Sequence, residues 1–166
     1  MIRISSSREI RSLLRSTLAM PADFERVILC SPFIDEETFR DLVSLSESTT
    51  RAQCGFRVVT RAEIADKLLL GLPSQRSPLA DAIVRVPALH AKCFLALSRD
   101  VRRTRAIVTS ANLTVPGLWS NIEIGVVAAP TSDAGRQLVS EVREFLERLL
   151  DIPRRSLSIF NPRRAA

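Results

Sequence analysis

Five polar side chains interrupt apolar segments in the second half of the 166-residue chain. They are His90 and Lys92, then Ser110 and Asn112, and finally Glu123. The members of each pair stand two residues apart, so in a β-strand both side chains of a pair would project from one face of the sheet. Because a buried ionisable group is costly unless it has a partner, one shared site would explain why all five occur among core-forming residues.

These residue types are suited to breaking a phosphate ester. A histidine can attack phosphorus through one ring nitrogen when a carboxylate accepts a hydrogen bond from the other, and His90 and Glu123 fit these roles. Lys92 and Asn112 could donate hydrogen bonds to the non-bridging phosphate oxygens as negative charge develops there, with Ser110 as a further donor. We therefore predict catalytic roles for His90, Lys92, Asn112 and Glu123, and phosphate binding by Lys92, Ser110 and Asn112.

Each residue also has a purely structural explanation. A single histidine on a strand is more often a core or surface residue than a catalyst. Ser110 and Asn112 could be turn residues at a strand end, and Glu123 could be a solvated carboxylate at a strand edge. Taken one at a time, these explanations leave the spacing of the set unaccounted for.

Hydrophobic periodicity predicts the elements that must position these residues. Strands are expected at 26–30, 56–60, 82–86, 89–97, 105–110 and 121–128. Helices are expected at 6–20, after an N-cap at Asp35, at 62–70 and at 132–150, with loops at 44–52 and 74–77. The last helix should direct five apolar side chains inward: Leu138, Val142, Phe145, Leu146 and Leu149. Helices alternate with strands early and strands cluster late, which is typical of a mixed α/β sheet layered with helices.

Length and composition favour a single domain with a polyanionic partner. We expect one domain over 1–151 and a basic C-terminal tail at 152–166 that could be disordered. The net charge of +6 suits nucleic acid and anionic lipid alike. All basic residues except Lys67 and Lys92 are arginines, which a biased genome would also produce.

The cysteines and the N-terminal region bear on where in the cell the protein is expected to act. Cys30, Cys54 and Cys93 lie far apart without the paired spacing of a zinc site, and their odd number does not suggest a disulfide framework. We expect them to be reduced and buried. Arginines interrupt the N-terminal segment where a signal peptide would be apolar, and no apolar run approaches membrane-spanning length. We therefore expect a soluble, cytoplasmic protein that does not act in a membrane.

Three segments together resemble the phospholipase D superfamily in order and residue types: 89–92 (LHAK), 109–114 (TSANLT) and 121–125 (NIEIG). A weaker resemblance includes 31–34 (SPFI), so the likeness covers about 26–127. The resemblance implies an α/β/α sandwich around a mixed sheet, a phosphohistidine intermediate, neither metal nor other cofactor, and substrates ranging from phospholipids to DNA and RNA.

One position departs from the family pattern. The family signature is His-x-Lys-x4-Asp, and its aspartate position falls here on Leu97, with Asp100 three residues later. In the family that aspartate mainly supports the structure around the site, so its loss removes none of the groups assigned to phosphate chemistry. The departure favours an alternative in which the chain is a catalytically silent domain that binds or assembles on nucleic acid.

The single histidine has a consequence for assembly. Superfamily members with two motif copies use one histidine as nucleophile and the other as general acid, and this chain has one histidine. The resemblance therefore implies a homodimer that shares one site, as in the small single-motif nucleases of the family. We expect an endonuclease acting on DNA or RNA, open to recruitment by a larger defence or repair assembly, with a phospholipid hydrolase as a further alternative.

Three further residues could contact substrate near the site. Phe33 and Trp119 could stack bases, although a role in the core or in anchoring a loop is favoured for both. Arg61, which follows a predicted strand, could contact substrate at the rim.

Overall fold

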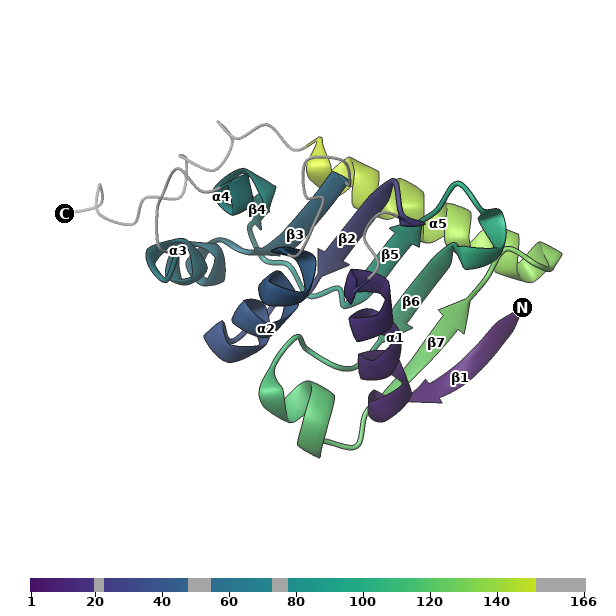
Figure 1. Cartoon of the computed structure of the whole chain (residues 1–166), viewed down its shortest axis with the longest axis horizontal. Helices are drawn as coiled ribbons and strands as arrows, with labels where there is room; N and C mark the ends of the chain where they lie inside the picture. Colours follow the sequence, from purple (N-terminus) through teal and green to yellow (C-terminus); the bar gives the residue numbers. More distant parts are fainter. Residues whose placement is uncertain (20–22, 48–54, 73–77, 152–166) are drawn as a thin grey trace.

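A seven-stranded mixed sheet runs through the molecule in the order β1-β7-β6-β5-β2-β3-β4 (Figure 1). The computed structural model describes residues 1–19, 23–47, 55–72 and 78–151. The strands are β1 (Ile2–Ser6), β2 (Arg26–Cys30), β3 (Gly55–Arg61), β4 (Ile83–Val86), β5 (Cys93–Leu97), β6 (Arg105–Thr109) and β7 (Ile124–Ala128). Strands β2, β3 and β4 are parallel, and the remaining neighbours pair antiparallel.

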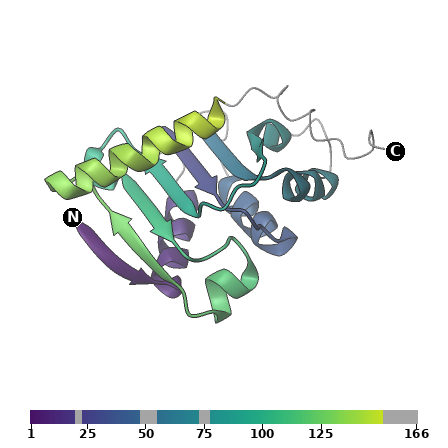
Figure 2. The ribbon, with the colours of Figure 1, turned by 180° about the vertical axis from the view of Figure 1, so that it is seen from behind.

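Helices cover both faces of this sheet. They are α1 (Ser7–Ala19), α2 (Glu36–Glu47), α3 (Ala62–Leu70), α4 (Pro78–Ala82) and α5 (Asp133–Leu150). Helices α1 and α2 lie on one face, and Figure 2 shows α5 crossing the other. Two short helical turns, Val101–Arg103 and Pro116–Ser120, lie in loops. The predicted α/β/α arrangement around a mixed sheet is therefore confirmed.

The core divides into two clusters, one on each face of the sheet. On the α1 side, Ile10 and Leu18 pack against strand residues that include Leu29. On the α5 side, Val142 and Leu146 pack against strand residues that include Leu95. Because β2 is covered on both faces, its consecutive apolar residues are all buried, which is why the sequence reads there as an unbroken apolar run.

Several predicted elements agree closely with the structure. The bounds of β2 and α3 coincide with the predicted ranges 26–30 and 62–70. Asp35 acts as the predicted N-cap of α2, since its Oδ1 accepts a hydrogen bond from the Thr38 backbone N–H at 2.8 Å. The other oxygen, Oδ2, accepts from the Val115 backbone N–H at 2.6 Å. The cap therefore also ties α2 to the loop that follows β6.

Other predictions were wrong. Strand β1 precedes α1, and periodicity missed it because this edge strand leaves both Ile2 and Ile4 exposed. Helix α2 continues to Glu47, where a loop was predicted from residue 44. Neither α4 nor the turn at Pro116–Ser120 was expected. Phe145 was predicted to face inward, but it is 38% exposed on α5.

Some predictions lie outside the described residues, namely Cys54, the loop at 74–77 and the basic tail at 152–166. The single-domain assignment over 1–151 stays a prediction. Cys30 and Cys93 are buried free thiols, as expected. The contact with the Cys93 thiol, together with burial, raises the pKa of Cys30. Within the described helices, none is long and apolar enough to cross a membrane.

Gly135 provides a test of the packing between α5 and the end of β7. A Cβ added to this residue would overlap the Ala129 backbone carbonyl oxygen. We expect Gly135→Ala to lower the free energy of unfolding by about 1–3 kcal/mol, although alanine is the better helix former by about 1 kcal/mol. Urea denaturation followed by circular dichroism measures the change. Ala134→Gly, at an exposed position in the same turn, is the control and should show only the loss of helix propensity.

Candidate functional site

The ends of four strands meet at one edge of the sheet, the lower edge in Figure 1. Strands β2 and β6 finish there, and strands β5 and β7 begin there. The register pairs Cys30 with Cys93, Cys93 with Val108, and Thr109 with Gly125. The segments that adjoin these positions therefore lie side by side, and they contain all five predicted site residues.

Ser110 and Glu123 are in direct contact at this edge. The Ser110 hydroxyl donates a hydrogen bond to Oε2 of Glu123, and the Ile124 backbone N–H donates to the same hydroxyl at 3.1 Å. The Ser110 backbone N–H donates to the Ile124 carbonyl at 3.0 Å, which extends the ladder between β6 and β7 by one bond. The other carboxylate oxygen of Glu123, Oε1, has a longer contact of 3.4 Å with Nδ2 of Asn121. Glu123 therefore has one oxygen bound to Ser110 and one only loosely engaged.

Lys92 lies on the neighbouring segment, where its backbone carbonyl accepts a hydrogen bond from the Thr109 N–H at 3.0 Å. This bond places Lys92 beside the chain that continues into Ser110. The Lys92 side chain is half-buried, and His90, two residues earlier, is exposed. Among the described residues, none forms a hydrogen bond with the His90 imidazole.

The local geometry around His90 differs from the prediction. Strand β5 begins at Cys93, so His90 and Lys92 lie in the loop that leads into the strand. The prediction that the two side chains project from one face of a strand therefore has no support in the structure. The loop starts at a tight turn in which Ala88 has a φ of 53°, a left-handed conformation that is unfavourable for a residue with a Cβ. Strand β7 likewise begins at Ile124, which leaves Glu123 just before it.

Asn112 lies on the loop after β6, and hydrogen bonds connect this loop to the loop after β2. The next residue, Leu113, donates its backbone N–H to the buried Ser31 hydroxyl at 3.1 Å, and its carbonyl accepts from the Asp35 N–H at 3.2 Å. Asn112 is itself half-buried, and its Oδ1 is buried without a hydrogen-bond partner among the described residues. An unpaired buried polar atom is uncommon in folded proteins, so its retention calls for an explanation.

Two groups that matter here were not assigned to the site from the sequence. The Ser31 hydroxyl joins the loops after β2 and β6, and its signal was a polar residue directly after a buried strand. Arg61, named only as a rim residue, donates from Nε to the Leu89 carbonyl at 2.9 Å. It therefore holds the residue that immediately precedes His90.

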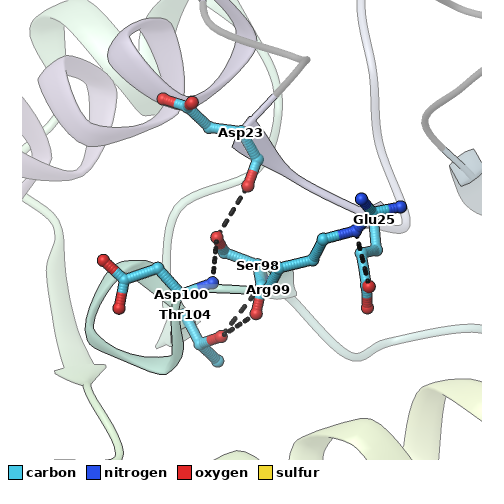
Figure 3. A network of polar contacts seen from close by, with 6 residues as sticks. All are labelled: Asp23, Glu25, Ser98, Arg99, Asp100 and Thr104. Atoms are coloured by element: carbon cyan, nitrogen blue, oxygen red, sulfur yellow. Dashed lines mark hydrogen bonds and ion pairs between the residues drawn. The ribbon is translucent and has the colours of Figure 1, made fainter.

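The position of the missing family aspartate lies at the far end of β5. Leu97 ends this strand, half-buried against the α5-side core. Beyond it, the Ser98 hydroxyl donates to the Asp23 carbonyl at 2.6 Å, and the Ser98 backbone N–H donates to Oγ1 of Thr104 at 3.1 Å (Figure 3). Asp100 accepts from the Arg102 N–H and so caps the turn at Val101–Arg103. Hydrogen bonds therefore connect the segments at this end of β5 although no aspartate occupies position 97.

The part of the chain that the structure describes contains no group of three or more His, Cys, Asp or Glu side chains placed to hold a metal ion.

Truncation to alanine should change the free energy of unfolding differently at Ser110 and at Asn112. Ser110→Ala removes a hydroxyl bonded to Glu123 and to the Ile124 backbone, so we expect it to lower the free energy of unfolding by about 1–2 kcal/mol. Asn112→Ala removes a buried oxygen that has no partner, so we expect stability to stay the same or rise by up to about 1 kcal/mol. Denaturant titration of the two variants measures this contrast. A loss for Asn112→Ala equal to that for Ser110→Ala would contradict it.

Comparison with known proteins agrees with this architecture. No family model matches the sequence, and no curated protein matches it. Among solved structures, NucT from Helicobacter pylori is similar with a TM-score of 0.55 at 12% identity, covering 89% of this chain and 96% of NucT. Nuc from Salmonella typhimurium, a phospholipase D family member, has a TM-score of 0.54 at 15% identity, covering 91% of this chain and 92% of Nuc.

Part of a larger protein has a similar fold. Phosphatidylserine synthase from Haemophilus influenzae is similar with a TM-score of 0.59 at 14% identity, over 87% of this chain and 36% of the synthase. The chain thus spans about a third of the synthase but nearly the whole of NucT and Nuc. The resemblance seen in the sequence is confirmed at the level of architecture, and this chain has the fold of the phospholipase D superfamily.

Proposed function

We propose that this chain is a metal-independent phosphodiesterase, an endonuclease that cleaves DNA or RNA through a phosphohistidine intermediate. The observation that carries the proposal is that the segments with Lys92, the Ser110–Glu123 pair and Asn112 lie side by side at one end of the strands, next to the segment with an exposed His90. The net charge of +6 favours a polyanionic substrate.

In this mechanism a ring nitrogen of His90 attacks phosphorus, and the bond from phosphorus to the leaving oxygen breaks. Water then hydrolyses the phosphorus–nitrogen bond and regenerates the imidazole. Lys92 and Asn112 donate to the non-bridging oxygens, where charge accumulates, and Ser110 supports them. The loosely engaged Oε1 of Glu123 is the oxygen available to accept from the second ring nitrogen of His90.

The unpaired oxygen of Asn112 fits this role. A carboxamide whose Oδ1 accepts from a neighbouring ammonium or imidazole leaves its Nδ2 to donate to phosphate. Residues held for catalysis often leave polar groups unsatisfied in the free protein, because the arrangement suits the substrate complex and not the resting state. The missing partner of Oδ1 in Asn112 is therefore expected to appear when the site is occupied.

Departure of the leaving oxygen needs a proton, and a second histidine must come from another chain because this one has a single histidine. We propose a homodimer with twofold symmetry that joins two copies of the site. An exposed apolar surface beside the site supports this. Ile4 and Val108 both pair with Val126 across adjacent antiparallel strands, so their side chains share one face of the sheet.

We call Ile4, Val108 and Ile124 the apolar face. They are 73%, 42% and 60% exposed, respectively. Figure 2 shows α5 crossing this side of the sheet near the opposite end of the strands, which leaves the site end of β6, β7 and β1 without a helix over it. Because Ile124 follows Glu123 directly, a second copy bound here would bring its own site close to the first.

His90 provides the direct test of the mechanism. We expect the wild-type protein to cleave labelled oligonucleotides and bis(p-nitrophenyl) phosphate in the presence of EDTA, and His90→Ala to lower kcat about 10³-fold or more. Phosphorus label from the substrate should remain on wild-type protein denatured with SDS at alkaline pH, where the phosphorus–nitrogen bond survives, and be absent from the variant. A requirement for added Mg²⁺, or full activity of His90→Ala, would contradict the mechanism.

The same assay separates the alternatives. Salt-sensitive binding of nucleic acid without turnover, unchanged in His90→Ala, would identify a catalytically silent binding or assembly domain, the alternative that Leu97 favours. Turnover of phosphatidylcholine vesicles with none on oligonucleotides would identify a phospholipid hydrolase.

The apolar face gives a separate prediction. Ile4→Asp should leave the fold intact, because the side chain is exposed, and should convert the dimer to monomers by placing a charge in the interface. We expect light scattering to report a lower mass and specific activity to fall at least about tenfold, because the second histidine is lost. Leu70→Asp is the matched control, since Leu70 is 78% exposed on α3. Wild-type activity that persists at dilutions yielding monomers would exclude a shared site.

A further inference from the structure

Arg61 and Phe33 form a cation–aromatic pair next to the candidate site. Arg61 ends β3, and Phe33 lies in the loop after β2, the neighbouring parallel strand. The guanidinium carbon of Arg61 is 4.7 Å from the centroid of the Phe33 ring. The site as proposed above uses neither side chain.

Both members of the pair are fastened to segments that carry site residues. Nε of Arg61 donates to the carbonyl of Leu89, the residue before His90, at 2.9 Å. The Phe33 carbonyl accepts from the Ser31 hydroxyl at 2.8 Å, and the same hydroxyl accepts from Leu113, the residue after Asn112, at 3.1 Å. The pair is therefore held in place relative to both the His90 segment and the Asn112 loop.

Arg61 retains donors that can bind a phosphate. Its Nη1 lies 4.0 Å from Oε1 of Glu63, which is at the limit for an ion pair, and the Glu63 side chain is 64% exposed. The Arg61 side chain is 26% exposed, so its terminal nitrogens can reach a ligand while Nε stays bound to Leu89. An ordered guanidinium with free N–H groups is the preferred bidentate partner of a phosphate.

Phe33 is an exposed aromatic residue. It is 42% exposed, although the guanidinium of Arg61 lies over the ring. Aromatic rings in contact with cationic side chains are the stacking platforms on which proteins hold unpaired bases. In a duplex the bases are stacked on one another and cannot reach such a ring, whereas the bases of a single strand can.

We propose that Phe33 and Arg61 bind the nucleotide next to the scissile phosphate, with its base stacked on Phe33 and its phosphate on Arg61. The substrate class is then single-stranded nucleic acid. This inference rests on the proposed function, because it extends the same site toward β3. The ring supplies contact with any base, so the pair favours single strands over duplexes without reading a sequence.

The experiment compares three substrates: a single-stranded oligonucleotide, the same sequence as a blunt duplex, and bis(p-nitrophenyl) phosphate. The quantity measured is the ratio of kcat/KM on the single strand to kcat/KM on the small diester. We expect Phe33→Leu, which keeps an apolar side chain but removes the ring, to lower this ratio about tenfold, mainly through KM. Phe33→Tyr, which keeps the ring, should have the wild-type ratio.

Trp119→Leu is the matched control. Trp119 is also 42% exposed and also lies against an arginine, with the Arg11 guanidinium 5.0 Å from its ring, but it lies on the turn at Pro116–Ser120 against α1. We expect this variant to keep the wild-type ratio. Arg61→Gln should reduce the salt dependence of single-strand binding by about one phosphate contact.

The outcomes separate the inference from the proposed function. If the wild-type protein turns over neither the oligonucleotide nor the small diester, the proposed function fails. If it turns over the small diester but Phe33→Leu and Trp119→Leu keep the same ratio, or if duplex and single strand are cleaved equally well, the assignment of Phe33 and Arg61 is overturned. Should Phe33→Leu fail to fold, as judged by circular dichroism, an unchanged salt dependence of single-strand binding in Arg61→Gln would overturn the assignment.

Discussion

The buried hydroxyl of Ser31 joins two loops on which the candidate site depends. It donates to the Phe33 carbonyl at 2.8 Å and accepts from the Leu113 N–H at 3.1 Å, so one side chain sets the spacing between the ends of β2 and β6. Asp35 reinforces the link, because its carboxylate caps α2 and accepts from the Val115 N–H. The loop that carries Asn112 is therefore positioned by the strand two places away in the sheet and by the helix that follows it.

The site combines groups that are satisfied with groups that are not. Ser110 is bonded both to the Glu123 carboxylate and to the Ile124 backbone, so these groups are paired in the absence of a ligand. Asn112 has an unpaired buried oxygen, Ala88 occupies a left-handed conformation, and His90 is exposed. Local costs of this kind persist where the surrounding structure enforces them, and they concentrate at functional sites. Under the proposed function, a bound substrate would provide a reason to keep the unpaired oxygen of Asn112.

Leu97, which occupies the aspartate position of the family pattern, lies away from the five candidate residues. Leu97 is the last residue of β5, whereas Lys92 directly precedes the first residue of that strand, so the two positions lie at opposite ends. At the Leu97 end, Ser98 and Thr104 connect the turn after β5 to the start of β6, and Ser98 also reaches the segment before β2 (Figure 3). These hydrogen bonds connect the segments at the Leu97 end of β5, away from the segment that carries Lys92.

The sequence by itself determined the layer architecture and the strands and helices with strong periodicity, and it singled out five polar residues as candidates for a site. These features could be predicted because burial patterns are local, as the apolar run of β2 and the Asp35 cap of α2 show. Only the tertiary structure decided that His90 and Lys92 precede β5, that Glu123 bonds to Ser110, and that Arg61 holds Leu89. The physical reason is that strand ends, side-chain partners and the exposed edge strand β1 depend on contacts between residues far apart in the chain, which no local pattern records.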